Sequence, residues 1–215
     1  MKKKFLALAV SAMLGMGIAS SASALSVTYL GVLPSPKVQL VIDDQSGPNK
    51  FSFTLTTTQG YADFLALGFN FSGTPALTAS DFTVTAAANT NGPITPLPPL
   101  TLFGDGSTKV GTCGNGCNFN GGGSASLFDY IVRIATQGSA GNDNVQSISF
   151  DLLATGTLVD NPFSQLAVRA QNTNLNGNSI KTDLSIAPVP LPAGAPLLLG
   201  GLGILALLRR RRKAV

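Results

Sequence analysis

The sequence predicts an all-β protein: a single β-sandwich of about seven to eight strands, flanked by an N-terminal signal helix and a C-terminal hydrophobic helix. Three observations support this. Short apolar runs alternate with polar residues, residues typical of turns separate these runs, and the middle of the chain lacks a convincing helical pattern. Many short strands joined by polar turns are typical of sandwiches.

Eight runs have the length and pattern of strands. The clearest is 51–56, in which Phe, Phe and Leu alternate with Ser, Thr and Thr, so that one face is apolar and the other carries hydroxyls. The run 64–71 is apolar nearly throughout and predicts a more buried strand. The full set is 37–42, 51–56, 64–71, 82–85, 128–135, 145–153, 163–170 and 180–186.

Two further features concern the core and the edges. Phe supplies 12 of the 15 aromatic residues, and at alternating strand positions it is expected to fill the core. The proline-rich stretch 91–100 is expected to be an extended loop or an edge segment, because proline cannot donate to a central ladder.

The charge pattern excludes several functions. Only 11% of the residues are charged, against about 25% in a typical soluble domain, and the chain has no His, Glu or Trp. Without His, a Ser-His-Asp triad is excluded, and no cofactor or enzyme activity is predicted. Between the two basic ends six cations face ten Asp residues, which argues against nucleic acid as a partner.

Residues 1–24 have the layout of a secretory signal. Three lysines precede the apolar run 5–18, and Ala22 and Ala24 provide the small side chains at which signal peptidase cuts. We expect cleavage after Ala24; an uncleaved N-terminal anchor is the alternative. Domain boundaries follow: a signal peptide at 1–24, a β-sandwich at 25–187 and a C-terminal segment at 188–215.

The C-terminal segment has three parts. A proline motif comes first, an uncharged run at 197–208 follows, and a basic block then precedes the end of the chain. The run is short beside the roughly 20 residues that span a bilayer, and positive-inside logic places the basic block in the cytoplasm. The motif is Val189, Pro190, Leu191, Pro192 and Ala193, and the arginines of the block are Arg209, Arg210, Arg211 and Arg212.

This tripartite tail resembles the PEP-CTERM sorting signal of Gram-negative bacteria, and most closely its VPLPA-CTERM variant. The resemblance covers roughly the last 27 residues. It implies that an exosortase in the inner membrane removes the hydrophobic helix and passes the body to the cell surface or extracellular matrix, in bacteria that make biofilm. Leu191 stands where the parent motif usually has Glu. A plain C-terminal anchor is one alternative; a Gram-positive sortase signal is another, although the Thr-Gly pair of its LPxTG box is missing here.

The body offers a disulfide and weak calcium candidates. Cys113 and Cys117 are the only cysteines, and the glycines on either side of Asn115 let the chain curl enough to join them. A metal site, a redox pair and free thiols remain alternatives. For calcium, oxygen ligands are required, and the candidates in polar turns are Asp43, Asp44, Asp105 and Asp143. None lies in an EF-hand pattern, so solvated turn carboxylates are the competing interpretation.

Together these features predict an exported surface or extracellular-matrix protein with a structural or adhesive role in a biofilm. Its expected partners are signal peptidase, an exosortase-like enzyme, the inner membrane and exopolysaccharide. A secreted carbohydrate- or calcium-binding module is the alternative.

Overall fold

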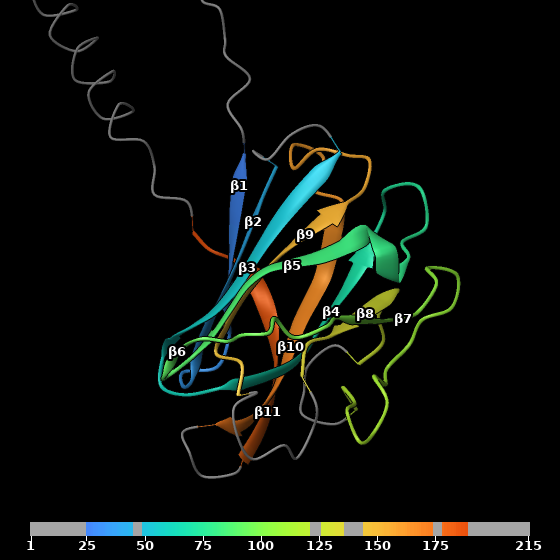
Figure 1. Cartoon of the computed structure of the whole chain (residues 1–215). Coiled ribbons are helices and arrows are strands. Elements are labelled where there is room, and N and C mark those ends of the chain that lie inside the picture. The colour runs from blue at the N-terminus through green and yellow to red at the C-terminus, as the bar shows by residue number, and fades with distance from the viewer. Residues whose placement is uncertain (1–24, 45–48, 121–125, 136–143, 174–177, 189–215) are drawn as a thin grey trace, which may run out of the picture. The chain divides into compact units, whose positions relative to one another are not determined.

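The computed structural model describes residues 25–44, 49–120, 126–135, 144–173 and 178–188, and this part of the chain is almost entirely β (Figure 1). One short 3-10 helix, η1 (Ala79–Asp81), interrupts the strands. The strands are β1 (Ser26–Gly31), β2 (Lys37–Asp43), β3 (Lys50–Gln59), β4 (Asp63–Phe71), β5 (Phe82–Asn89), β6 (Gly92–Pro93), β7 (Thr101–Phe103), β8 (Tyr130–Arg133), β9 (Ser147–Leu153), β10 (Phe163–Thr173) and β11 (Asn178–Ile186).

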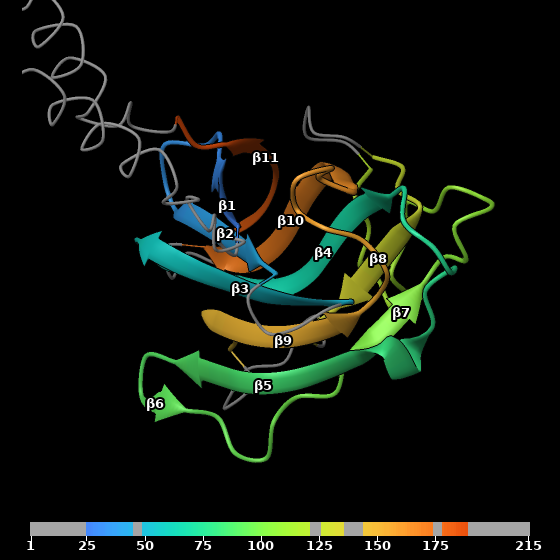
Figure 2. The same ribbon diagram turned by 90° about the horizontal axis from the view of Figure 1, so that it is seen from above.

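All eleven strands belong to one curled antiparallel sheet. Their order is β6-β5-β9-β3-β2-β1-β11-β10-β4-β8-β7, so the first and last strands are hydrogen-bonded neighbours in its middle. Seen from above, the sheet curls so that β3, β9 and β5 face β10, β4 and β8 (Figure 2). The main core lies between these two sets of strands, because it draws buried residues from both.

Phenylalanines form the centre of this core, as the sequence predicts. The ring of Phe53 stacks on that of Phe150 with centroids 4.8 Å apart, and meets that of Phe163 edge-on at 5.1 Å. Phe51 also packs edge-on against Phe163, with ring centroids 5.0 Å apart. Aromatic pairs of this geometry add about 0.5–1.5 kcal/mol beyond their buried area.

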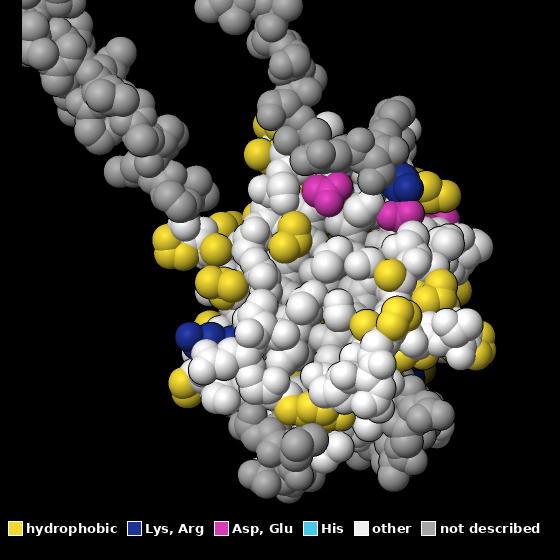
Figure 3. Space-filling model, turned by 60° about the vertical axis from the view of Figure 1, so that its left-hand side comes forward, with side chains coloured by type: hydrophobic (Ala, Val, Ile, Leu, Met, Phe, Trp, Pro, Cys, Tyr) yellow, Lys and Arg dark blue, Asp and Glu magenta, His cyan; other side chains and the backbone are white. Residues whose placement is uncertain are grey.

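The alternation in β3 is confirmed. Phe51, Phe53 and Leu55 are fully buried. The intervening hydroxyls bond across to β9, with Ser52 donating to Asp151 at 2.7 Å and Thr54 lying 3.1 Å from Ser149. Few charged side chains lie on the face shown in Figure 3.

The structure corrects the predicted strand count. The described residues form eleven strands; the three that were not predicted are β1, β6 and β7. β6 and β7 have only two and three residues, too few to show an alternating pattern. β6 opens the proline-rich stretch and lies at the end of the sheet, in agreement with an edge position.

The predicted signal helix and C-terminal hydrophobic helix fall outside the described residues. Within the described part, no helix is long and apolar enough to cross a membrane.

Candidate functional site

A disulfide joins Cys113 to Cys117 at the tip of a loop between β7 and β8. Their Cα atoms are 5.0 Å apart. Gly114, Asn115 and Gly116 all adopt positive φ, at 73°, 43° and 76°, a conformation that Gly and Asn tolerate. The turn is closed by the Cys113 N–H, which donates to the Cys117 carbonyl at 2.9 Å. We refer to residues 111–120 as the cystine loop.

A second small core holds the cystine loop on the outer face of the sheet, away from the main core. Both cysteines are buried there with Phe119 and Phe128, against Ala66 of β4 and other apolar residues of the sheet. The rings of Phe119 and Phe128 meet at 4.9 Å. A Cβ on Gly68 would lie 2.7 Å from the Phe128 ring, so glycine is required where that ring crosses β4.

Three cations lie in one register row beneath this loop. Ala66 of β4 is opposite Arg133 of β8 on one side and Arg169 of β10 on the other, and Arg169 is opposite Lys181 of β11. Residues directly opposite each other in a sheet project from the same face. Arg133, Arg169 and Lys181, which we call the cation row, therefore share the face that carries the cystine loop.

The two outer members of the row tie the loop down. Arg133 donates from Nη1 to the Cys113 carbonyl at 3.2 Å and from Nε to the Ala135 carbonyl at 3.0 Å. Lys181 donates from Nζ to Oδ1 of Asn118 at 3.2 Å, and also to the Asn120 carbonyl. The loop is thus hydrogen-bonded at both of its ends.

Arg169, between them, is poorly satisfied. It is only 6% exposed, and its Nε has no hydrogen-bond partner. Its Nη1 lies 3.5 Å from the Ser179 hydroxyl, at the long limit of a hydrogen bond. Burial lowers the pKa of Arg169, and burial followed by the charge of Arg169 lowers the pKa of Lys181. Within the described residues, no carboxylate bonds to the Arg169 guanidinium.

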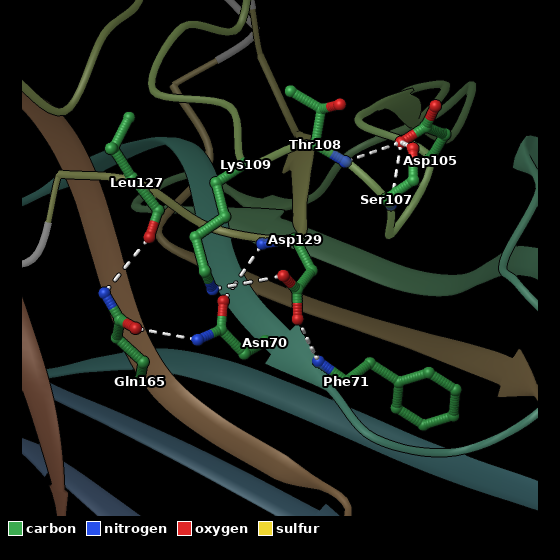
Figure 4. Close-up of polar contacts among 9 residues, drawn as sticks. All are labelled: Asn70, Phe71, Asp105, Ser107, Thr108, Lys109, Leu127, Asp129 and Gln165. Atoms are coloured by element: carbon green, nitrogen blue, oxygen red, sulfur yellow. Dashed lines mark hydrogen bonds and ion pairs between the residues drawn. The ribbon is translucent and has the colours of Figure 1, made fainter.

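A second polar cluster on the same face is fully bonded (Figure 4). Asp129 accepts from Lys109 Nζ at 3.1 Å and from the Phe71 N–H at 3.3 Å, while its own N–H donates to Asn70 at 3.0 Å. Asn70 donates to Gln165 at 2.7 Å, and Gln165 donates to the Leu127 carbonyl at 3.1 Å. We call Asn70, Lys109, Asp129 and Gln165 the polar network.

The polar network fixes a β-bulge. The register between β10 and β4 shifts between Ser164 and Ala167, and Gln165 there has a φ of 49°. Positive φ is uncommon for a residue other than glycine and marks a bulged, constrained backbone. Both hydrogen bonds of the Gln165 side chain hold it in that position.

The three calcium candidates within the described residues, Asp43, Asp44 and Asp105, do not form a metal site. Asp105 closes its own turn, accepting from the Ser107 hydroxyl at 2.7 Å and from the Ser107 and Thr108 N–H groups at 2.9 and 3.2 Å. Hydrogen bonds from Ser107 and then Thr108 lower the pKa of Asp105. Asp43 ends β2, opposite Ser26 and Ser52. The described ranges contain no group of three acidic, Cys or His residues placed to hold a metal ion.

Asp44 binds the start of the described chain instead. Its Oδ1 accepts from the Leu25 N–H at 2.8 Å and its Oδ2 from the Leu158 N–H at 3.1 Å. Asp143, the signal residues Ala22 and Ala24, the motif 189–193 and Arg209–Arg212 lie outside the described residues.

Sequence reasoning missed the cation row and the polar network. Arg133, Arg169 and Lys181 each occupy a run predicted as a strand, and a cation inside such a run was the available signal. Comparisons with models of known families, with curated proteins and with solved structures found no match. Function is therefore inferred from the residues themselves.

Proposed function

We propose that this chain is an exported surface or extracellular-matrix protein, matured at both ends, whose β-domain serves a structural or adhesive role. Signal peptidase would cut after Ala24, and an exosortase-like enzyme would recognise the proline motif 189–193 while the tail lies in the inner membrane. The body would then reach the cell surface or the matrix of a biofilm. The resemblance of the tail to the VPLPA-CTERM signal supports this route.

The contact between Leu25 and Asp44 is the observation that carries the proposal. Leu25 is the residue that cleavage after Ala24 would leave first, and its nitrogen already lies 2.8 Å from a carboxylate oxygen of Asp44. Cleavage would turn this amide into an ammonium and the hydrogen bond into an ion pair. The fold is therefore suited to a chain that begins at Leu25.

The disulfide agrees with a location outside the cytosol. Disulfides persist mainly in oxidising compartments outside the cytosol, and the cystine loop contains one. We propose further that the two facing parts of the curled sheet act as a sandwich around the Phe core, a rigid body suited to a scaffold.

Intact mass spectrometry of the protein recovered from the surface of its host tests the proposal. The measured mass is expected to match a chain that begins at Leu25 and lacks residues 197–215. It should also be two hydrogen atoms lighter than that of the same chain with reduced cysteines. A tail still present on surface material would contradict processing, and a different first residue would contradict the role of Leu25.

A stability comparison tests the Asp44 contact separately. Asp44→Asn is expected to destabilise a chain beginning at Leu25 by up to about 1 kcal/mol more than a chain that carries extra residues before Leu25. Asp160→Asn, at an exposed turn, is the matched control. Equal losses in the two chains would show that Asp44 does not bind a free terminus.

A further inference from the structure

The cation row has an excess of positive charge at a partly buried place. Arg133, Arg169 and Lys181 project from one face. Two carboxylates lie near the row by register: Asp183 is opposite Ala167, and the buried Asp63, opposite Gln171, accepts from the Gln171 side chain and the Val145 N–H. Burying a cation without a paired anion is costly, and a second cation beside it adds repulsion. This region would be relieved by an added negative charge.

Donors remain at the centre of the row. Arg169 Nε has no partner. The Lys181 ammonium has three protons, of which Asn118 and Asn120 receive two. Because Arg169 and Lys181 are opposite each other on neighbouring strands, their side chains start about 5 Å apart, a distance that a group with two or three oxygens can bridge.

The guanidinium also contacts an exposed residue. Its Nη1 extends to the hydroxyl of Ser179, which is exposed, and Lys181 is half-exposed. Ser179 and Lys181 are two residues apart on β11 and share a face. This part of β11 therefore brings a hydroxyl, an ammonium and the edge of a guanidinium together.

We propose that Arg169 and Lys181, with the Ser179 hydroxyl, form an oxyanion site that takes a carboxylate group. Arginine presents planar donors that match the two oxygens of a carboxylate, and lysine adds a point charge. The carboxylate belongs either to a free small acid or to a residue of an acidic polymer. This inference does not depend on whether the ends of the chain are processed.

Binding experiments on the full-length chain in nonionic detergent test the site. The probes are glucuronate, a polyglucuronate of the same sugar, and glucose as the neutral control, all at constant ionic strength. We expect the wild type to bind at least one of the two acidic probes, and Lys181→Gln to weaken that binding about tenfold. Lys37→Gln, which removes an exposed cation at the start of β2, is expected to leave it unchanged.

The two sources give different results. Binding of both glucuronate and the polymer, weakened in Lys181→Gln, identifies a site for a small carboxylate. Binding of the polymer alone, weakened in the same variant, identifies an acidic chain as the ligand. No binding of either acidic probe overturns the proposal, as does binding that Lys181→Gln and Lys37→Gln weaken equally. Arg169→Gln is a second test of the same site. If Arg169→Gln fails to fold, the result for Lys181→Gln still tests the proposal.

Discussion

The polar network and the cation row lie on the same face of the sheet, but they differ in how far their polar groups are hydrogen-bonded. In the network, Asp129 accepts from two donors and Gln165 both donates and accepts. In the row, Arg169 is buried, its Nε has no partner, and its contact with Ser179 is long.

This difference separates structure from function. A buried polar cluster whose members are all bonded holds the backbone in one arrangement, here the bulge at Gln165. A buried cation without a carboxylate weakens the fold instead, and such local conflicts concentrate at functional sites. The bonding of the network indicates a structural role, and the unsatisfied Arg169 is the reason for proposing a ligand site at the row.

Phe128→Ala is expected to have the largest effect, because the Phe128 ring packs in the second core beneath the cystine loop and its neighbour Asp129 belongs to the polar network. Loss of a buried Phe side chain should lower the free energy of unfolding by about 3–5 kcal/mol. Urea denaturation measures this loss. Leu127→Ala, at a neighbouring side chain that is 49% exposed, should change it by less than about 0.5 kcal/mol. Equal losses in the two variants would show that the second core contributes nothing.

Asp129→Ala breaks the satisfied region. It leaves the Phe71 N–H and the Lys109 ammonium without their acceptor, so a loss of about 1–3 kcal/mol is expected. Lys109→Ala removes only an exposed ion pair and should lower stability by no more than about 1 kcal/mol. If the two variants lost the same stability, the hydrogen bond from the Phe71 N–H to Asp129 would contribute nothing to the stability of the network.

Arg169→Met and Arg133→Met apply one substitution to two members of the cation row, and we expect opposite signs. Arg133 gives charged donors to the Cys113 and Ala135 carbonyls, so its loss should lower stability by about 1–2 kcal/mol. Replacing Arg169 removes a buried charge that lacks a carboxylate, so stability in anion-free buffer should stay the same or rise by about 1 kcal/mol. A large loss of stability in Arg169→Met would mean that the Arg169 charge is well paired in the fold, and the contrast with the polar network would then fail.

Asp105→Asn should have the smallest effect and one that depends on pH. Hydrogen bonds from Ser107 and Thr108 hold the pKa of Asp105 below its ordinary value of 3.8. The folded state therefore favours the carboxylate, and the resulting stability is complete above that ordinary value and is lost as pH falls through the lowered pKa. Thermal unfolding of the variant and the wild type should differ at pH 7 and converge as the pH falls below that lowered pKa. A difference that persists in acid would assign the effect to the turn geometry.

Much of the fold could be predicted because it depends on local pattern. The run 51–56 became β3, and 180–186 lies within β11, since alternation alone decides which face is buried. That the sheet is one curled unit depends on the pairing of β1 with β11, from opposite ends of the described chain, and no local pattern encodes this.

The site divides in the same way. Cys113 and Cys117 could be paired from the sequence because they are close together and glycines flank the turn between them. The cation row could not, because Arg133, Arg169 and Lys181 meet only through the register of four strands. That register shifts between Arg169 and Ala170, and a change of one residue there would place the charges on the opposite face.

The position of β11 between β1 and β10 also affects the rate of folding. Contacts between the first and last strands span nearly the whole described chain, so they form late and slow the folding of the sheet. In a chain that is exported N-terminus first, one edge of β1 would stay unpaired until residue 186 has also been exported. During that interval a strand from another copy could pair with β1 in place of β11. Chaperones or rapid completion of transport would then favour the monomer over aggregates.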